Sequence, residues 1–195
     1  MNDGKGNLSL AVNALPEMYS PGSCIAAEDF DRDGDLDLFV GGSAEPGRYP
    51  LPARSYLLQN DHGRFSDVTE ARAPDLKNPG IITAAQWTDI NRDGLPDLIL
   101  TGEWMPVSVF LNGAKGFTNA TEQMGLKESS GWWSALAIAD LDKDGDMDLI
   151  AGNFGLNSRF KASEQNPLTI YASDFDRNGS LDAIVCRRVD GEEKP

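Results

Sequence analysis

Short apolar runs recur along the 195-residue chain between segments rich in aspartate, asparagine and glycine. The runs are too short and too rich in strand-forming residues to be helices, and several end at glycine, so the pattern predicts β-strands. Six of them flank three acidic segments, one on each side, and cover residues 24–27, 36–40, 82–87, 96–100, 134–139 and 147–151. Each acidic segment is therefore expected to connect two neighbouring strands.

A turn signal recurs downstream of these strand pairs. Asparagine opens residues 60–68 and 112–120, each after a further strand candidate, and the start of the chain, 2–10, has the same pattern. Asparagine and glycine supply the positive φ that a tight hairpin needs. One repeat is therefore predicted to be a four-stranded antiparallel meander: strand, acidic loop, strand, longer loop, strand, turn and strand.

Repeats of roughly 40–50 residues with four strands each are typical of β-propeller blades. We therefore expect an all-β fold, a partial propeller of about three blades that forms a single domain over residues 1–195. It would contain the end of a preceding blade, followed by three blades, at residues 1–20, 22–70, 80–121 and 132–188.

The fourth acidic segment starts only 34 residues after the third, whereas the earlier spacings are 60 and 51 residues. Leu168–Ser173 fits as the third strand of the blade at 132–188, which puts the fourth acidic loop between strands three and four of that blade. The alternative is a new blade that begins at Leu168. That arrangement leaves the third blade without its outer strands.

The acidic segments share the motif D-x-[DN]-x-[DN]-G-x-x-D. Side-chain oxygens at positions 1, 3, 5 and 9 and the backbone carbonyl of position 7 can converge on one hard cation, and the glycine at position 6 lets the chain turn back around it. The motif predicts up to four Ca²⁺ sites. Their ligands would be Asp29, Asp31, Asp33, Asp35, Asp37, Asp89, Asn91, Asp93, Leu95, Asp97, Asp140, Asp142, Asp144, Asp146, Asp148, Asp174, Asp176, Asn178, Ser180 and Asp182.

Another calcium motif, the EF-hand, is excluded because it needs a glutamate at position 12 and helices on both sides. Position 12 is apolar in all four copies: Val40, Leu100, Ala151 and Val185. Loops one and three should bind more tightly, since Asn91 and Asn178 each replace one carboxylate in loops two and four. Magnesium is less expected, because it seldom uses an all-protein cage.

The formal net charge is −14, and 16 of the 31 acidic residues lie in the four motifs. The acidity is therefore mainly a metal-site signature. It argues against nucleic acid and anionic membrane surfaces as partners, because both attract lysine and arginine.

No apolar run approaches 18 residues, so no membrane insertion is expected. The first residues, 1–4, resemble a cut inside a repeat, which indicates a fragment of a larger propeller. The apolar faces at the ends of such an arc would favour self-association, unless the N-terminal segment covers one of them. Cys24 and Cys186 both lie in apolar, strand-like contexts, which favours two free thiols over a disulfide.

The loops and the glycine-rich segments after them resemble the FG-GAP/VCBS repeats of integrin α-subunit propellers. The segments that carry this likeness are 39–46, 100–106 and 150–156. Further segments resemble bacterial homologues of cartilage acidic protein, which often carry an ASPIC/UnbV domain: 47–50, 102–106, 130–133 and 152–161. The resemblance implies a secreted, calcium-dependent propeller.

Catalytic signatures are few. The only histidine, His62, lies in a predicted hairpin turn and reads as a solvated turn residue. Trp87 lies within a strand and is expected in the core, whereas Trp104 and the Trp132–Trp133 pair are either packing residues or stacking platforms. We expect a binding module for an unknown protein or glycan in adhesion, not an enzyme.

Such a module would act outside the cell, at the cell surface or in the periplasm. The alternatives are a propeller-type polysaccharide lyase, or another carbohydrate-active enzyme, and a lectin-like glycan binder. Loops on the face opposite the metals would recognise the ligand. The candidate residues are Arg48, Tyr49, Glu103, Trp104, Asn153, Asn157, Arg159 and Lys161.

Overall fold

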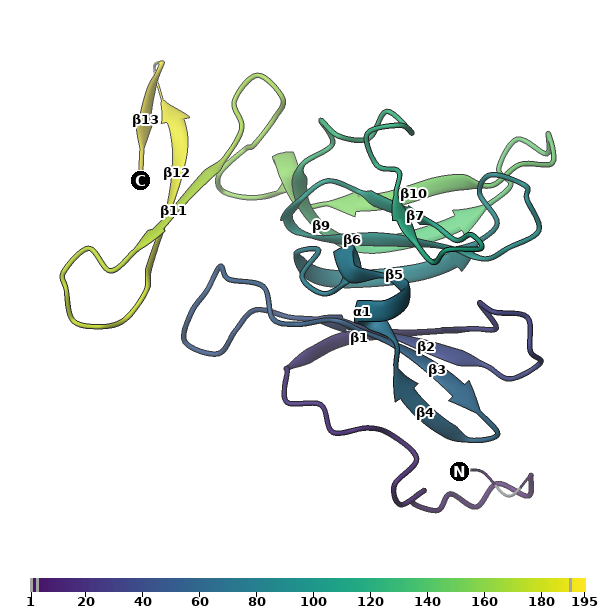
Figure 1. The fold of residues 1–195 in the computed structure, drawn as a ribbon. Helices are drawn as coiled ribbons and strands as arrows, with labels where there is room; N and C mark the ends of the chain where they lie inside the picture. Colours follow the sequence, from purple (N-terminus) through teal and green to yellow (C-terminus); the bar gives the residue numbers. More distant parts are fainter. Residues whose placement is uncertain (1, 3, 190) are drawn as a thin grey trace.

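Three antiparallel sheets make up the protein, whose structure is a computed structural model that describes residues 2, 4–189 and 191–195 (Figure 1). The side chain of Asn157 lies outside the described part. The predicted all-β class is confirmed, and the propeller architecture itself stays a prediction. The first sheet has the strand order β1 (Gly22–Glu28), β2 (Asp37–Gly42), β3 (Tyr56–Asp61) and β4 (Arg64–Asp67).

The second sheet combines two repeats. In its first repeat β5 pairs with β6, β6 with β7 and β7 with β8, and the last residues of β6 also pair with the start of β9, through Glu103–Trp132 and Met105–Gly131. Strand β9 then pairs with β10. The strands are β5 (Ile81–Thr88), β6 (Asp97–Met105), β7 (Ser108–Leu111), β8 (Thr118–Asn119), β9 (Gly131–Ala139) and β10 (Asp148–Asn153).

The third sheet differs from the sequence-based expectation. It contains β11 (Thr169–Ser173), β12 (Asp182–Val189) and β13 (Glu192–Lys194) and lies apart from the others in Figure 1. Among the described residues β10 and β11 belong to different sheets, so 132–188 does not form one meander. Strand β12 pairs with β11 along one edge and with β13 along the other, as β2 does with β1 and β3, so it occupies a second-strand position and not the outer, fourth-strand position expected for it. This pairing agrees with the alternative of a unit that begins near Leu168.

Helical segments are short. The α-helix α1 (Thr69–Arg72) and the 3₁₀ helix η1 (Pro74–Leu76) follow the first sheet, and the 3₁₀ helix η2 (Gly155–Asn157) follows β10. Leu76 of η1 is fully buried in the core. None of the described helices has the length and apolar character that crossing a membrane requires.

The segment before β1 runs along the edge of the first sheet. The backbone N–H of Phe65 in β4 donates to the carbonyl of Ala14 at 2.8 Å. Leu8 and Leu10 remain 82% and 88% exposed, so they do not cover an apolar end of the protein. Residues 1 and 3, which belong to the expected end of a preceding blade, lie outside the described residues.

Alternate residues of the strand after each acidic loop pack against opposite neighbours, because successive side chains of a strand point to opposite faces. Phe39 of β2 shares a buried cluster with Leu98 and Leu100 of β6. Ile99, between these two leucines, faces the other way and packs with Leu149 of β10. The chain thus repeats one packing rule at two successive interfaces.

The same rule explains which apolar residues stay exposed. Ile150 of β10 has the motif position of Phe39 and Ile99, which are both fully buried, yet it is 45% exposed. No strand of the described chain packs over it as β10 packs over Ile99. The outward face of β9–β10 is therefore apolar, like the faces of β2 and β6 that are buried between sheets.

Two cysteines and one tryptophan behave as the sequence indicates. Both cysteines are free, with Cys24 half-buried in β1 and Cys186 buried in β12. Trp87 packs against the core, with its ring centroid 6.1 Å from that of Phe30 and 5.8 Å from that of Phe117.

Matched truncations test the packing rule. Ile99→Ala should lower the free energy of unfolding by about 2–5 kcal/mol, because it leaves a cavity in a closed interface. Ile150→Ala, at the same motif position on the open face, should cost less than about 1 kcal/mol. Urea unfolding of both variants measures the difference, and equal losses would contradict the assigned packing.

Candidate metal centre

The four acidic loops share one backbone conformation. In each, the carboxylate of position 1 accepts the backbone N–H of the glycine at position 6, over 3.0, 2.8, 3.1 and 2.9 Å in chain order. The glycines have φ between 89° and 97°, where a side chain would strain the backbone. Position 4 is also left-handed, and it is a basic residue each time: Arg32, Arg92, Lys143 and Arg177.

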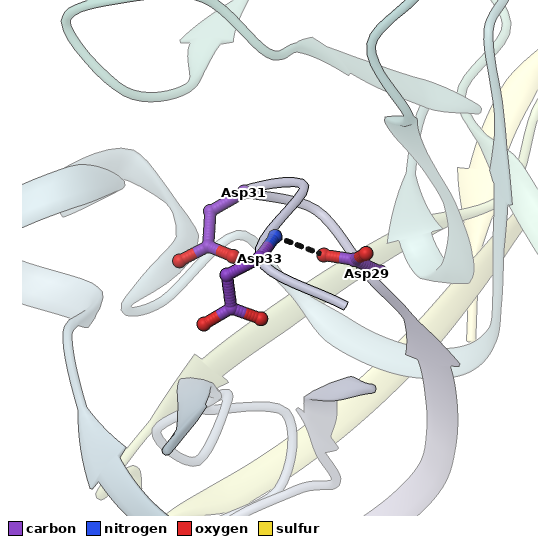
Figure 2. A group of neighbouring side chains, drawn as sticks. All are labelled: Asp29, Asp31 and Asp33. Atoms are coloured by element: carbon purple, nitrogen blue, oxygen red, sulfur yellow. Dashed lines mark hydrogen bonds between the residues drawn. The ribbon is translucent and has the colours of Figure 1, made fainter. Parts of the chain in front are cut away.

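Loop one brings three carboxylates together. Asp29, Asp31 and Asp33 each offer an oxygen, and these oxygens lie within 4.8 Å of one another. Figure 2 shows the three side chains around the turn, where the Asp33 N–H donates to Asp29 Oδ1 at 3.1 Å. Asp31 Oδ1 is buried and has no hydrogen-bond partner. A buried carboxylate oxygen without a donor is costly, so this atom fits a cation ligand.

The other loops differ from loop one in which carboxylates they bring together. Loops three and four also bring three carboxylates together, but from motif positions 1, 3 and 9 instead of 1, 3 and 5: Asp140, Asp142 and Asp148, and Asp174, Asp176 and Asp182. Loop two has no such group among the described residues, since position 3 is Asn91. Its amide oxygen is a neutral ligand, so loop two presents less charge to a cation.

In the first two loops the aspartate at position 9, a predicted metal ligand, also accepts hydrogen bonds from the backbone. Asp37 and Asp97 are fully buried, and both oxygens of each accept backbone N–H groups. Asp37 accepts from Phe30 at 3.1 Å and from Asn60 at 2.7 Å. Asp97 accepts from Ile90 at 3.1 Å and from Asn112 at 2.8 Å. Each carboxylate therefore ties its loop to the third strand of its sheet and keeps lone pairs for a metal.

Burial sets the electrostatics of these two carboxylates. Desolvation raises the pKa of Asp37 to about 6, although the N–H groups of Asn60 and Phe30 oppose the shift. Desolvation raises the pKa of Asp97 in the same way. A cation nearby would lower the pKa of both carboxyl groups, because it favours their ionised form.

The single histidine is a turn residue beside loop one. His62 joins β3 to β4, and its side chain is 91% exposed. Its backbone N–H donates to Asp35 at 2.7 Å. The neighbouring carboxylates, first Asp61 through a hydrogen bond, raise the pKa of the imidazole.

Three of the residues predicted for the ligand face, Tyr49, Glu103 and Trp104, lie together at the opposite end of the strands from the acidic loops. Trp104 lies seven residues beyond Asp97 along β6, roughly 20 Å from the loop. Tyr49 donates a hydrogen bond to Glu103 at 2.8 Å and accepts one from the Trp104 indole at 2.5 Å. Trp104 has φ 60°, a left-handed conformation that a bulky residue seldom adopts.

Two further aromatic rings, those of Trp132 and Phe154, follow Trp104 in a row. The sequence did not single out Phe154. Trp132 of β9 lies 5.2 Å from Trp104 and 5.3 Å from Phe154 between ring centroids. Phe154 is 46% exposed and was missed because only its place after β10 brings it here. We call Trp104, Trp132 and Phe154 the aromatic row. Trp133, in contrast, packs against the interior cluster of Ile99.

The remaining residues predicted to recognise the ligand make their contacts away from the aromatic row. Arg48 pairs with Glu45 at 2.8 Å, and the Asn153 side chain accepts the Gly155 N–H. Arg159 stacks on Phe160, and Lys161 donates to the Leu156 carbonyl, so both make their contacts within their own segment. The side chain of Asn157 is not among the described parts.

A comparison with known protein families matches part of the chain. Residues 89–151 match the family profile described as FG-GAP-like repeat. The match starts at Asp89 of loop two and ends at Ala151 after loop three, so it spans β6–β9 and much of β10. No curated protein matches the chain.

The buried Asp37 predicts a pH dependence of the calcium-free protein. Its pKa is higher in the folded chain, about 6, than the ordinary 3.8, so its stabilising contribution is complete below pH 4 and is lost as the pH rises through 6. The loss is at most about 3 kcal/mol, because one pKa unit corresponds to about 1.4 kcal/mol. Thermal unfolding in EDTA between pH 4 and 7 measures it.

Asp37→Asn is the control for this effect. The variant should be less stable at every pH, since one backbone N–H loses its acceptor, and its stability should fall less between pH 4 and 7. Identical slopes for both proteins would refute the role given to Asp37.

Proposed function

We propose that the chain is a calcium-binding β-propeller module that recognises a protein or glycan partner outside the cell, at the cell surface or in the periplasm. The observation that carries the calcium assignment is the buried, unpartnered Asp31 Oδ1 inside a ring of aspartates whose backbone turn recurs four times. The FG-GAP-like match over residues 89–151 supports a β-rich repeat of this kind.

Calcium fits the donor set better than other ions. The ligands are carboxylate, amide and carbonyl oxygens, which hard cations prefer, and the sites contain no histidine or cysteine ligand. Exposed loops of this type suit dissociation constants of roughly 10⁻⁴ M, which calcium outside cells satisfies and cytosolic calcium does not. The compartment is proposed on this ground.

Calcium should therefore stabilise the fold. With dissociation constants on the order of 10⁻⁴ M, 1 mM calcium contributes roughly 1.4 kcal/mol per site, or about 6 kcal/mol for four sites. The melting temperature should rise by roughly 10–20 °C over that in EDTA. Asp29→Ala should remove one site from the calorimetric stoichiometry. A melting temperature that is the same in calcium and in EDTA would contradict the proposal.

Ligand recognition is proposed at the end of the strands that carries the aromatic row. Partly exposed aromatic rings beside a carboxylate suit a sugar ring or a peptide side chain. The left-handed backbone of Trp104 supports a functional role, because strain of this kind persists where the surroundings hold a side chain in place for a purpose. Here the Tyr49 hydroxyl and the Trp132 ring hold it.

A polysaccharide lyase is the less favoured alternative. Such an enzyme needs a base, and a tyrosine or histidine is the usual choice near an acid. Burial, together with the Glu103 carboxylate, raises the pKa of Tyr49 to about 12, so the phenol stays protonated at neutral pH. His62 lies beside loop one, at the other end of the strands from Glu103. We therefore propose binding without catalysis.

A binding screen tests the recognition surface. The chain is presented to glycan and protein arrays in 1 mM calcium, and Trp104→Ala should weaken the binding found there at least tenfold, because it removes the ring that contacts both Tyr49 and Trp132. Tyr171→Ala, which removes a half-exposed ring on β11, is the matched control and should leave binding unchanged. Equal binding by wild type and Trp104→Ala would refute the assigned surface.

A further inference from the structure

Two hydrogen bonds link acidic loop one to the repeat of acidic loop two: one comes from Asn112, which follows β7, and one runs directly between the two loops. The side-chain amide of Asn112 donates to the carbonyl of Phe30 at 2.7 Å, and both residues are buried. At the surface, the guanidinium of Arg32 donates to the carbonyl of Gly94 in an exposed contact, so the buried Asn112 bond is the stronger link of the two. Phe30 and Arg32 are positions 2 and 4 of loop one, and Gly94 is position 6 of loop two.

Asn112 contacts both loops at once. Its backbone N–H donates to Asp97 of loop two at 2.8 Å while its amide holds loop one. Asn60 has the same position in the first sheet, and its N–H donates to Asp37 in the same way. The Asn60 amide, however, binds the carbonyl of Leu36 in its own loop at 3.0 Å. One residue type at one position thus makes an inter-loop link in one sheet and an internal link in the other.

The other loops are joined less closely or not at all. Arg92 of loop two lies 3.5 Å from Asp146 of loop three, but both side chains are more than half exposed. Such a contact is weak in water. Within the described residues, the side chain of Arg177 in loop four makes no hydrogen bond or ion pair with another loop.

We propose that loops one and two bind calcium as a positively coupled pair, with Asn112 as the residue that couples them. This inference rests on the proposed calcium function. Calcium in loop one would fix the backbone of residues 29–37 and so the Phe30 carbonyl. That carbonyl orients Asn112, which in turn holds the Asp97 carboxylate of loop two. A site that is already ordered loses less conformational freedom when it binds the second ion.

The proposal predicts how strongly calcium binding in each loop depends on the other loops. Emptying loop one should raise the calcium concentration at which loop two is half-filled by about fivefold to tenfold, a typical coupling between sites. Loop three should respond to loop two by less than about twofold, because only an exposed ion pair links them. Loop four should be independent of the other three.

The test follows each loop separately by NMR in the full chain labelled with ¹⁵N-glycine. The amides of Gly34, Gly94, Gly145 and Gly179 each donate to the first aspartate of their own loop, so each reports calcium in that loop. Titration of wild type and Asp29→Ala gives the response of loop two to the loss of loop one. The same comparison is then repeated in Asn112→Ala, which keeps the backbone donor to Asp97 and removes only the inter-loop amide.

The expected result is a shift of at least fivefold in the Gly94 midpoint on Asp29→Ala, reduced to less than twofold in the Asn112→Ala background. Asn60→Ala, which removes the equivalent amide within loop one, should leave the fivefold shift intact. If Asn112→Ala does not fold, Arg32→Ala replaces it. That variant removes the second inter-loop bond and should halve the shift, while Arg177→Ala should not change it.

Two results would overturn the proposal, and they differ. If all four glycines respond to calcium but the Gly94 midpoint is the same in wild type and Asp29→Ala, the coupling is absent and the calcium function stands. If no glycine responds to calcium up to 10 mM, a concentration about a hundredfold above the expected dissociation constant, the calcium function itself is wrong.

Discussion

The two buried carboxylates of Asp37 and Asp97 are the interaction on which the rest of the structure depends. Each collects one N–H from its own acidic loop and one from the end of the third strand, so the loop cannot move independently of its sheet. A buried carboxylate is costly unless it is hydrogen-bonded, so these N–H groups hold each loop against the strand whose end supplies one of them.

Side chains alternate strictly between the two faces of β2 and β6, and this alternation lets successive sheets pack on one another as a stack. Phe39 and Ile99 face forward and Leu98 and Leu100 face back, so each sheet offers one apolar face to each neighbour. The stack places equivalent loops side by side, which allows Asn112 to reach a loop 82 residues earlier in the chain. Contacts between repeats therefore depend on how the sheets pack, which brings motif residues of one loop next to the neighbouring loop.

Much of the local structure could be predicted from the sequence, because it depends on residues close together in the chain. The acidic motif gave the turn, the glycine with positive φ and the strand pairing on both sides. A second local signal was overlooked: Thr69 and Thr121 follow Asp67 and Asn119 by two residues, and both hydroxyls accept an N–H from the third strand of their sheet, from Leu57 and Val109 respectively. The pattern is short and polar, and it looked like an ordinary turn.

The strand pairing of the third sheet and the aromatic row could not be predicted from the spacing of motifs along the sequence. Both depend on which strand edges pair in the folded chain. The spacing between Asp140 and Asp174 allowed two placements of residues 168–173, and the hydrogen bonds of β12 to both β11 and β13 distinguish them. Phe154 and Trp132 become neighbours only once β9 and β10 are paired.

The most direct test of the calcium assignment is a crystal structure of the chain grown in calcium, with anomalous scattering recorded to locate the ions. The account predicts an ion in loop one bound by Asp29, Asp31 and Asp33, with metal–oxygen distances of about 2.3–2.6 Å, and Asp31 Oδ1 among its ligands. Crystals that diffract well and show only water between these three carboxylates would contradict it.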